Sequence, residues 1–175
     1  MATAKKTTGK STTKPPMTAR AAASDATVLL ARDHAQVKKL FKQYEKLADG
    51  QADAQERSEL AQQICQMLTV HATIEEEIFY PAAREAGVES DLLDEAEVEH
   101  ASAKDLIAQI EGMDADEELY DAKVKVLGEY IDHHVREEED EMFPKCRKAG
   151  MDLASLAASL SERKGELMEM ETVDS

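Results

Sequence analysis

The sequence predicts an all-α protein, built as an up-down-up-down four-helix bundle with an extra C-terminal helix. Three observations support this fold. Of the 175 residues, 42% are hydrophobic but only 4% are aromatic, and good helix formers such as Ala, Leu, Glu, Lys, Gln and Met dominate. Alternating runs of β-branched and aromatic residues, which indicate strands, are absent. Short connections separate long helical segments, so consecutive helices are expected to lie antiparallel.

The helix ends follow from capping residues and glycines. The first helix is expected to begin at a cap on Ser24 or Asp25 and to end near Asp49, where Ala-Asp-Gly provides a stop. Acidic or serine residues and following glycines bound the later helices in the same way. These helices are expected at residues 53–86, 89–112, 114–149 and, as the C-terminal addition, 152–171.

Three regions are expected along the chain. Residues 1–24 carry five basic residues and no acidic one, and their Thr, Lys, Ala and Pro content predicts a disordered basic tail. Residues 25–150 have the length of one domain with a core and hold the predicted bundle. Residues 151–175 form a C-terminal helix and tail. The apolar stripe of this helix is expected to pack on the bundle or on a second subunit in a homo-oligomer.

The net charge of −16 limits the expected partners. A strongly acidic surface repels nucleic acid and anionic membranes and attracts cations. No apolar run approaches the roughly 18 residues that a membrane span requires. Cys65 and Cys146 give no disulfide framework, which fits a reducing compartment. We therefore expect a cytoplasmic protein that binds neither nucleic acid nor membranes.

Two stretches of the chain repeat each other. Residues 70–81 read VHATIEEEIFYP and residues 133–144 read HHVREEEDEMFP, and each copy has a His, a Glu four positions later, an aromatic residue and a Pro. Residues 32–40 (RDHAQVKKL) similarly match residues 98–106 (VEHASAKDL). The sequence therefore predicts a duplicated helix pair. Each pair supplies one His and then a His-x-x-x-Glu motif to a site with pseudo-twofold symmetry.

One histidine falls in the middle of the apolar stripe of each predicted bundle helix, when residues are stepped alternately by three and four. Burying four imidazoles without partners would cost several kcal/mol, and a shared metal site removes this cost. In each repeated phrase, the Glu four residues after the His shares its helix face. The candidate metal ligands are His34, His71, Glu75, His100, His134 and Glu138.

This donor set favours two borderline cations. Four imidazoles and two carboxylates suit Fe, Zn or Mn better than Ca or Mg. Six donors exceed the four that a tetrahedral zinc takes, but they underfill two octahedral ions. Two ions bridged by the carboxylates therefore fit the count and leave positions for oxide, water and a small ligand.

The second repeated phrase contains an alternative histidine. His133 competes with His134, because Glu137 also follows it by four residues. The alignment of Pro81 with Pro144 favours His134, and so does the apolar stripe of that helix.

Other polar residues near the motifs are expected to have ordinary roles. The remaining acids of the repeated phrases, including Glu76 and Glu139, are expected on a solvated face of their helices. Tyr44 and Tyr130 are expected to pack, with hydrogen bonding to a ligand or to a bound oxygen species as the alternative.

With these motifs the chain resembles the hemerythrin-like, HHE cation-binding proteins over about residues 25–150. The resemblance implies a four-helix bundle with a non-haem di-iron centre that binds O2 or related small molecules. It also implies that the six candidates are ligands and that Glu75 and Glu138 bridge two iron ions, which an oxide or hydroxide also joins. Zinc and manganese are the alternative ions.

Two positions depart from the pattern of the oxygen-carrying hemerythrins. Those proteins have a further His one turn after the ligand of the third helix, where this chain has Lys104. A protonated lysine cannot bind a metal, which leaves an open or water-filled position on one iron. Their acidic bridge also follows its His by five residues rather than four, so Glu139 is an alternative to Glu138.

The expected function is the binding of O2, NO or peroxide at a di-iron centre for sensing, storage or detoxification. An enzyme that turns over peroxide or oxidises ferrous iron is one alternative, and a bundle that buffers zinc or iron is another. The sequence shows no dedicated acid/base pair and no substrate pocket beyond the site. A ligand- or metal-binding role is therefore favoured over a dedicated enzyme.

Overall fold

The computed structural model describes residues 25–173, with side chains through residue 170. The predicted basic tail (1–24) and the last two residues of the chain lie outside this range. Within it all regular structure is helical, which confirms the all-α prediction. The α-helices are α1 (Ala26–Asp49), α2 (Ala54–Ile74), α3 (Tyr80–Glu85), α4 (Ser90–Glu111), α5 (Tyr120–Glu137), α6 (Phe143–Lys148) and α7 (Leu153–Val173). Two π-helical turns complete the set, η1 (Glu75–Phe79) and η2 (Glu138–Met142).

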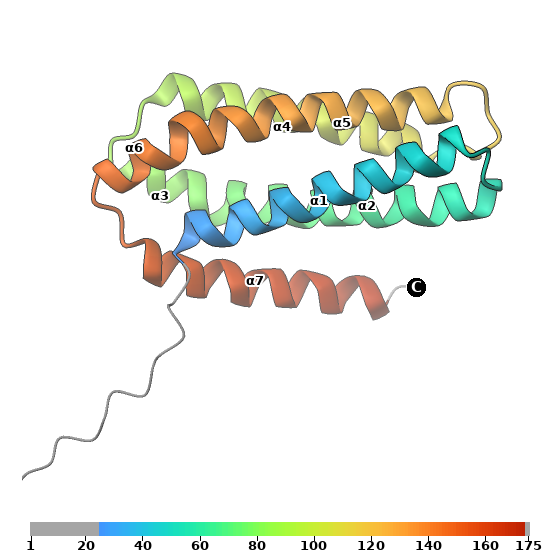
Figure 1. Ribbon diagram of the computed structural model, residues 1–175. Coiled ribbons are helices and arrows are strands. Elements are labelled where there is room, and N and C mark those ends of the chain that lie inside the picture. The colour runs from blue at the N-terminus through green and yellow to red at the C-terminus, as the bar shows by residue number, and fades with distance from the viewer. Residues whose placement is uncertain (1–24, 174–175) are drawn as a thin grey trace, which may run out of the picture.

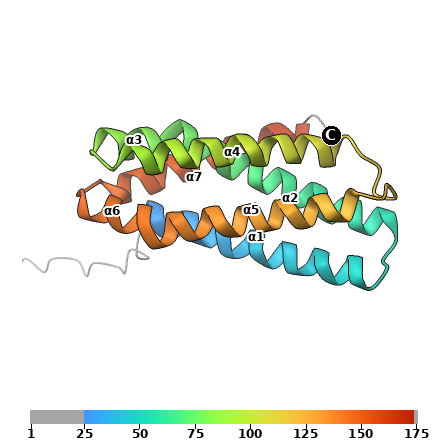
Figure 2. The ribbon, with the colours of Figure 1, turned by 90° about the horizontal axis from the view of Figure 1, so that it is seen from above.

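The helices form an antiparallel bundle (Figure 1). α2, η1 and α3 follow one another without a break, as do α5, η2 and α6, so four rods build the bundle. α1 packs on α2 and α5, while α4 packs on α5 and α2. Seen from above, α1 and α4 lie at opposite edges of the four rods (Figure 2). None of the described helices is long and apolar enough to cross a membrane.

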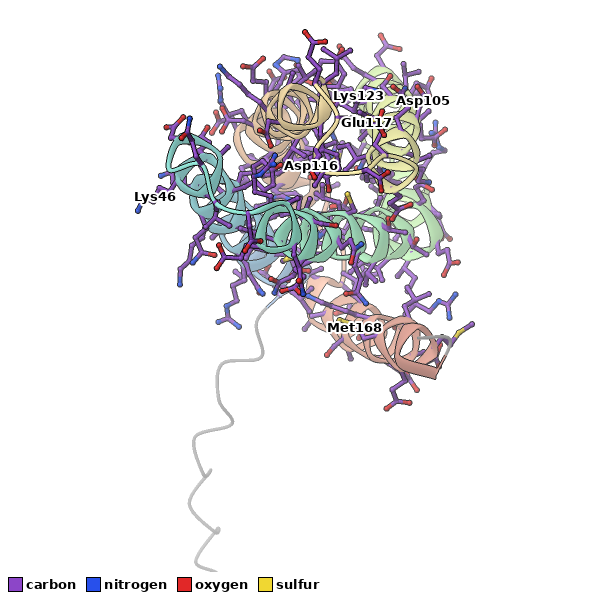
Figure 3. The ribbon with its side chains drawn as sticks, turned by 90° about the vertical axis from the view of Figure 1, so that its right-hand side faces the viewer. Lys46, Asp105, Asp116, Glu117, Lys123 and Met168 are labelled. Atoms are coloured by element: carbon purple, nitrogen blue, oxygen red, sulfur yellow. The ribbon has the colours of Figure 1, made fainter. Side chains whose placement is uncertain are left out.

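α7 lies outside the four rods, along α1 and α2 (Figure 1). Its Leu160 is fully buried and its Ala157 nearly so. The apolar stripe predicted for this segment therefore packs on the bundle. Toward the C-terminal end of α7, Met168 is exposed, and the end-on view shows it on a helix set apart from the four rods (Figure 3).

α1 and α2 begin where the sequence predicts, because local caps define their starts. The carboxylate of Asp25 accepts the backbone N–H of Val28 at 3.0 Å, and that of Asp53 accepts the N–H of Glu56 at 2.9 Å. These bonds satisfy N–H groups that a helix start leaves without a partner.

The last bundle helix begins later than predicted. α5 starts at Tyr120 rather than near Asp114, and residues 114–119 form turns. Asp116 and Glu117 lie on this connection at the end of the bundle (Figure 3). The Glu117 carboxylate accepts the N–H of Asp114 at 2.9 Å. This hydrogen bond closes a non-helical turn where the sequence predicts the first turn of the helix. Four acids among residues 114–118 would also repel one another in a helix.

The repeated phrases share a departure from α-helical geometry. In η1 the N–H of Tyr80 donates to the carbonyl of Glu75, and in η2 the N–H of Phe143 donates to that of Glu138. Each turn therefore holds one residue more than an α-helical turn. The Pro that both phrases share, Pro81 or Pro144, lies two residues after the turn. Proline has no N–H and crowds the carbonyl four residues earlier, which loosens the preceding turn.

A layer of polar residues divides the apolar core. One cluster of buried side chains, including Ile64 and Leu127, fills the end of the bundle near the α1–α2 connection. A second cluster, including Leu30, Phe79 and Leu160, fills the other end and extends to α7. The predicted histidines and glutamates lie between these clusters.

Candidate metal centre

Each rod of the bundle places one histidine in the layer between the two apolar clusters. His34 lies on α1, His71 on α2, His100 on α4 and His134 on α5, and all four are at most 8% exposed. Their Nε2 atoms face inward in two pairs. The Nε2 atoms of His34 and His71 are 3.0 Å apart, and those of His100 and His134 are 3.1 Å apart. The structure thus brings the four predicted histidines together.

Glu75 and Glu138 are the first residues of the two π turns, and both are buried. Glu75 spans the histidine pairs, with Oε1 3.2 Å from the Nε2 of His71 and Oε2 3.4 Å from the Nε2 of His100. Oε2 of Glu138 lies 3.2 Å and 3.4 Å from the Nε2 atoms of the α1 and α5 histidines. Each carboxylate therefore lies close to one histidine of each pair, which is the arrangement that a bridging ligand requires.

One oxygen of each glutamate has no hydrogen-bond partner. Glu75 Oε1 and Glu138 Oε2 are buried and accept no hydrogen bond, although a buried carboxylate is costly unless a donor or a cation satisfies it. Two overlapping sets of donors surround these oxygens, and within each set the donor atoms lie within 4.8 Å of one another. The sets are His34, His71, Glu75 and Glu138, and Glu75, His100 and His134. The residues present therefore fit two adjacent metal ions that share a carboxylate.

The negative charge of this layer changes the pKa values of its histidines. Burial lowers the pKa of His71, but the carboxylates of Glu75 and Asp33 outweigh it and raise that pKa to about 10. Burial also opposes the neighbouring carboxylates at His134, where Glu138 contributes most to raising the pKa to about 9. The metal-free layer thus holds protons on imidazoles, and a bound cation would replace these protons.

A carboxylate lies against the outer nitrogen, Nδ1, of each of the four inner histidines. An acceptor at Nδ1 fixes the tautomer and turns Nε2 toward the interior. Each contact joins two different rods, so the outer carboxylates also tie the bundle together. The contacts are His34 with Glu139 (2.9 Å), His71 with Asp33 (3.4 Å), His100 with Glu76 (2.9 Å) and His134 with Glu99 (2.7 Å).

The sequence prediction missed these outer carboxylates. Glu76 and Glu139 are 31% and 41% exposed, as expected for a solvated face, but each also lies against the Nδ1 of a buried histidine. Glu139 lies outside the α1 histidine, while Glu138 lies inside it, so the structure favours Glu138 as the inner carboxylate. The repeat contains a signal for this layer: Asp33 and Glu99 occupy equivalent positions, as do Glu76 and Glu139.

Two lysines neutralise two of the outer carboxylates. Lys104 Nζ lies 2.6 Å and 2.7 Å from the oxygens of Glu76, and Lys164 Nζ, on α7, lies 2.5 Å from Asp33. The stem of Lys104 lines a cavity beside the histidines, but its ammonium pairs with Glu76. The position one turn after His100 therefore offers no metal donor, and an open metal position there stays a prediction.

Tyr80 is a further polar residue of the centre. It is almost fully buried, and its hydroxyl donates to Glu138 Oε1 at 2.8 Å and lies 3.3 Å from His100 Nε2. Burial, with the charges of Glu138 and Glu75, raises its pKa well above the usual value. Tyr80 belongs to the Phe-Tyr-Pro segment of the first repeated phrase, but the sequence prediction did not single it out.

Three other candidates lie outside the centre. Tyr44 donates to Asp121 at 2.6 Å, and Tyr130 is exposed. His133 is exposed as well and pairs with Glu99 and with an acid on its own helix. The structure therefore favours His134 over His133 as the inner histidine of α5.

A small cavity adjoins the four histidines. Its volume is about 30 Å³. The histidines form one wall, and apolar side chains such as Leu68, Ile107 and Ile131 form much of the rest. The cavity therefore provides a mostly apolar space directly beside the candidate ligands.

The fold and the centre define a metal-binding helical bundle with a histidine–carboxylate site. The family model described as hemerythrin HHE cation binding domain matches residues 25–146. The chain belongs to this family, as its sequence motifs predicted.

One solved structure and one curated relative are similar to this chain. The crystal structure of a hemerythrin HHE cation binding domain-containing protein from Mycobacterium kansasii has a TM-score of 0.64 at 22% identity, and the match covers 81% of this chain and 88% of that one. This likeness supports the fold. A DNA nickase from Nostoc sp. (strain PCC 7120) is 32% identical over 115 residues, which are 66% of this chain and 31% of the relative. The match thus spans about a third of that protein.

Proposed function

We propose that this is a non-haem di-iron protein that binds O2 or a related small molecule, NO or peroxide, for sensing, storage or detoxification. The donors support iron, because imidazoles and carboxylates suit a borderline ion. The two donor sets, which share Glu75, support two ions rather than one. Zinc and manganese are the alternatives that the same donors accept.

The observation that carries the small-molecule proposal is the cavity beside the histidines. A volume of about 30 Å³ has room for about two water-sized molecules, which suits a ligand of two or three atoms. Water in such a space needs several polar partners, whereas an uncharged diatomic molecule does not. The mostly apolar wall therefore favours a ligand such as O2 or NO over bulk water.

Each group of side chains has a distinct task in this proposal. The Nε2 atoms and the two inner glutamates would bind the ions, and the carboxylates would offset their charge in a buried layer. The outer carboxylates hold the imidazoles in position, and the apolar clusters on both sides exclude water. Iron, when bound, supplies the redox change and the open positions that O2, NO or peroxide require.

Turnover of peroxide is the second candidate, and Tyr80 favours it. Its hydroxyl lies 3.3 Å from His100 Nε2, so one side of the centre has a hydroxyl that can form a hydrogen bond to a bound peroxide. The equivalent residue of the other half is Phe143, which has no such group. The remaining alternatives, oxidation of ferrous iron and metal buffering, have no comparable feature within the described residues.

The activity named for the Nostoc relative is not part of this proposal. The match covers 31% of that protein. A net charge of −16 also opposes binding to DNA phosphates, which depends on basic side chains. We expect a cytoplasmic protein whose partner is a small molecule, without a nucleic-acid or membrane partner.

Metal analysis of the purified protein, together with its visible spectrum, tests the proposal. We expect two irons per chain and charge-transfer bands that shift when azide is added. Glu75→Ala should lose the iron and the bands together, because it removes a carboxylate that both ions share. Glu85→Ala removes an exposed acid of α3 and should keep both. A single zinc per chain without such bands would exclude the di-iron proposal.

A further inference from the structure

A second cluster of metal-donor side chains lies on the surface next to the buried centre. It consists of Glu99 on α4 with His133 and Glu137 on α5, and donor atoms of all three lie within 4.8 Å of one another. The His133 side chain is 62% exposed, so the cluster is open to solvent. His133 and Glu137 form a His-x-x-x-Glu motif that overlaps the inner motif and that the buried centre does not use.

The distances within this cluster suit a bound cation. His133 Nε2 lies 3.4 Å from Glu99 Oε1 and 3.3 Å from Glu137 Oε1. A tetrahedral ion bound at about 2.1 Å separates its ligands by roughly 3.4 Å, so the imidazole already stands at ligand spacing from both carboxylates. Glu95 and Glu141 add further negative charge around Glu137. The cluster therefore combines donor spacing with a potential that attracts cations.

In the other half of the internal repeat, the carboxylate equivalent to Glu99 is paired with a cationic side chain. Asp33 and Glu99 are equivalent residues, 66 positions apart, and each lies against the Nδ1 of a buried histidine. In the first half, the ammonium of Lys164 on α7 pairs with Asp33 at 2.5 Å. In the second half, the ion pairs of Glu99 within the described residues are with His133 and His134, and none is with a lysine or arginine.

The two halves of the repeat also differ at the positions of His133 and Glu137. His133 and Glu137 stand where the first half has Val70 and Ile74, 63 positions earlier. Val70 and Ile74 are buried, in the half of the bundle on which α7 packs. α7 does not extend over the α4–α5 side (Figure 1). The second half is therefore open to solvent and has metal donors in place of apolar side chains.

We propose that Glu99, His133 and Glu137 bind a divalent transition cation, which takes the place of the Lys164 ammonium of the other half. One imidazole and two carboxylates suit Zn²⁺, Fe²⁺, Co²⁺ or Mn²⁺ better than Ca²⁺ or Mg²⁺. Glu99 links this ion to the buried centre, because its other oxygen lies 2.7 Å from His134 Nδ1. The site does not depend on which metal the buried centre holds.

Isothermal titration of the purified protein with Zn²⁺ tests this site. The wild type should bind one Zn²⁺ per chain more than His133→Ala does, and Glu137→Gln should weaken this binding by about tenfold or more. Glu141→Gln is the matched control, because it removes a nearby exposed acid that is not one of the three donors. Any zinc that enters the buried centre contributes equally to all four proteins and cancels in the comparison.

Crystals soaked in Zn²⁺ locate the ion independently. We expect an anomalous-scattering peak between the three side chains. The melting temperature of His133→Ala should match that of the wild type without added zinc, since the imidazole is largely exposed, and this separates lost binding from lost folding. Equal zinc binding in the wild type and His133→Ala, or no peak at this position, would overturn the proposal and leave His133 as an ion-pair partner of the two acids.

Discussion

Tyr80 makes the two halves of the centre chemically different. By the repeat it is equivalent to Phe143, whose ring stacks on His34 with centroids 5.9 Å apart. The Tyr80 ring also packs on His100, at 5.4 Å, but it is tilted by 35° from the imidazole plane. The aromatic packing is thus common to both halves, but only the Tyr80 side provides a hydroxyl, which donates to the buried Glu138 carboxylate.

Tyr80→Phe should leave the fold intact, because the other half already has Phe at this position. We expect the free energy of unfolding to fall by about 1–2 kcal/mol, since Glu138 Oε1 loses its buried donor. We also expect the azide affinity of the metal-loaded protein to change. Denaturant unfolding and azide titration measure the two effects. Tyr44→Phe, which loses a hydrogen bond to Asp121, is the control for stability alone, and an unchanged azide titration in Tyr80→Phe would contradict a role of the hydroxyl at the centre.

Lys104 occupies the position at which the oxygen-carrying hemerythrins have a further histidine. Lys104→His is expected to place a donor beside the cavity and to slow oxidation of the oxygen-bound protein, measured as absorbance decay in stopped flow. Lys104→Gln removes the ammonium from Glu76 without adding a metal ligand, so it isolates the effect of the ion pair. Decay in Lys104→His that is as fast as in the wild type would exclude an open metal position on this side.

At the scale of the helices, each π turn directs neighbouring residues to different sides of one histidine. Glu75 lies near Nε2 of His100 and Glu76 near its Nδ1, because successive residues of a helix point about 100° apart. The additional residue of the turn then brings Tyr80, five positions after Glu75, back toward the centre. The same arrangement recurs at η2, where Glu138 and Glu139 contact the two nitrogens of the α1 histidine.

α7 stabilises the bundle from outside the four rods. Leu160→Ala is expected to lower the free energy of unfolding by about 2–5 kcal/mol, because its fully buried side chain leaves a cavity. Met168→Ala, at the exposed end of the same helix, should change it by less than about 0.5 kcal/mol. Denaturant unfolding followed by circular dichroism compares the two. The metal content should be unchanged in both, since the six candidate ligands lie on other elements, and equally small effects would show that α7 does not pack on the bundle in solution.

For the whole molecule, the buried charges couple stability to pH when no metal is bound. His71 and His134 have pKa values of about 10 and about 9 in the fold, against a usual value of 6.5. The stability that they contribute is therefore complete below pH 6.5 and is lost as the pH rises through about 9 to 10. Burial raises the pKa of Glu75, but His71 and His100 outweigh burial and hold this pKa well below 4.5. Its contribution is present above pH 4.5 and is lost as the pH falls through the lower value.

The melting temperature of the metal-free protein should therefore fall between pH 7 and pH 10. The metal-loaded protein should show a smaller change over the same range, because bound cations replace the protons on the histidines and metal affinity rises with pH. Differential scanning calorimetry with and without a chelator makes the comparison. A metal-free protein that is as stable at pH 10 as at pH 7 would contradict the raised histidine pKa values.

The sequence by itself determined the features that depend on local spacing. A His in the middle of each apolar stripe and a Glu four residues after two of them must share a helix face, so the inner residues follow from periodicity alone. The starts of α1 and α2 follow from single capping aspartates. The start of α5 did not, because the Glu117 side chain closes a turn at a position that also resembles a helix cap.

Only the tertiary structure decided which residues surround the inner histidines and glutamates. The contacts of Asp33 with His71 and of Lys164 with Asp33 join different helices, and they depend on how far each helix is rotated about its axis when it packs. Local spacing carries no information about this rotation. The position of Tyr80 depends on the additional residue of a π turn, which a repeat of 3.6 residues misplaces. The inner position of the four histidines and two glutamates was therefore predictable from the sequence, whereas the outer carboxylates, the tyrosine and the contact of Glu99 with His133 became apparent only when the helices were packed together.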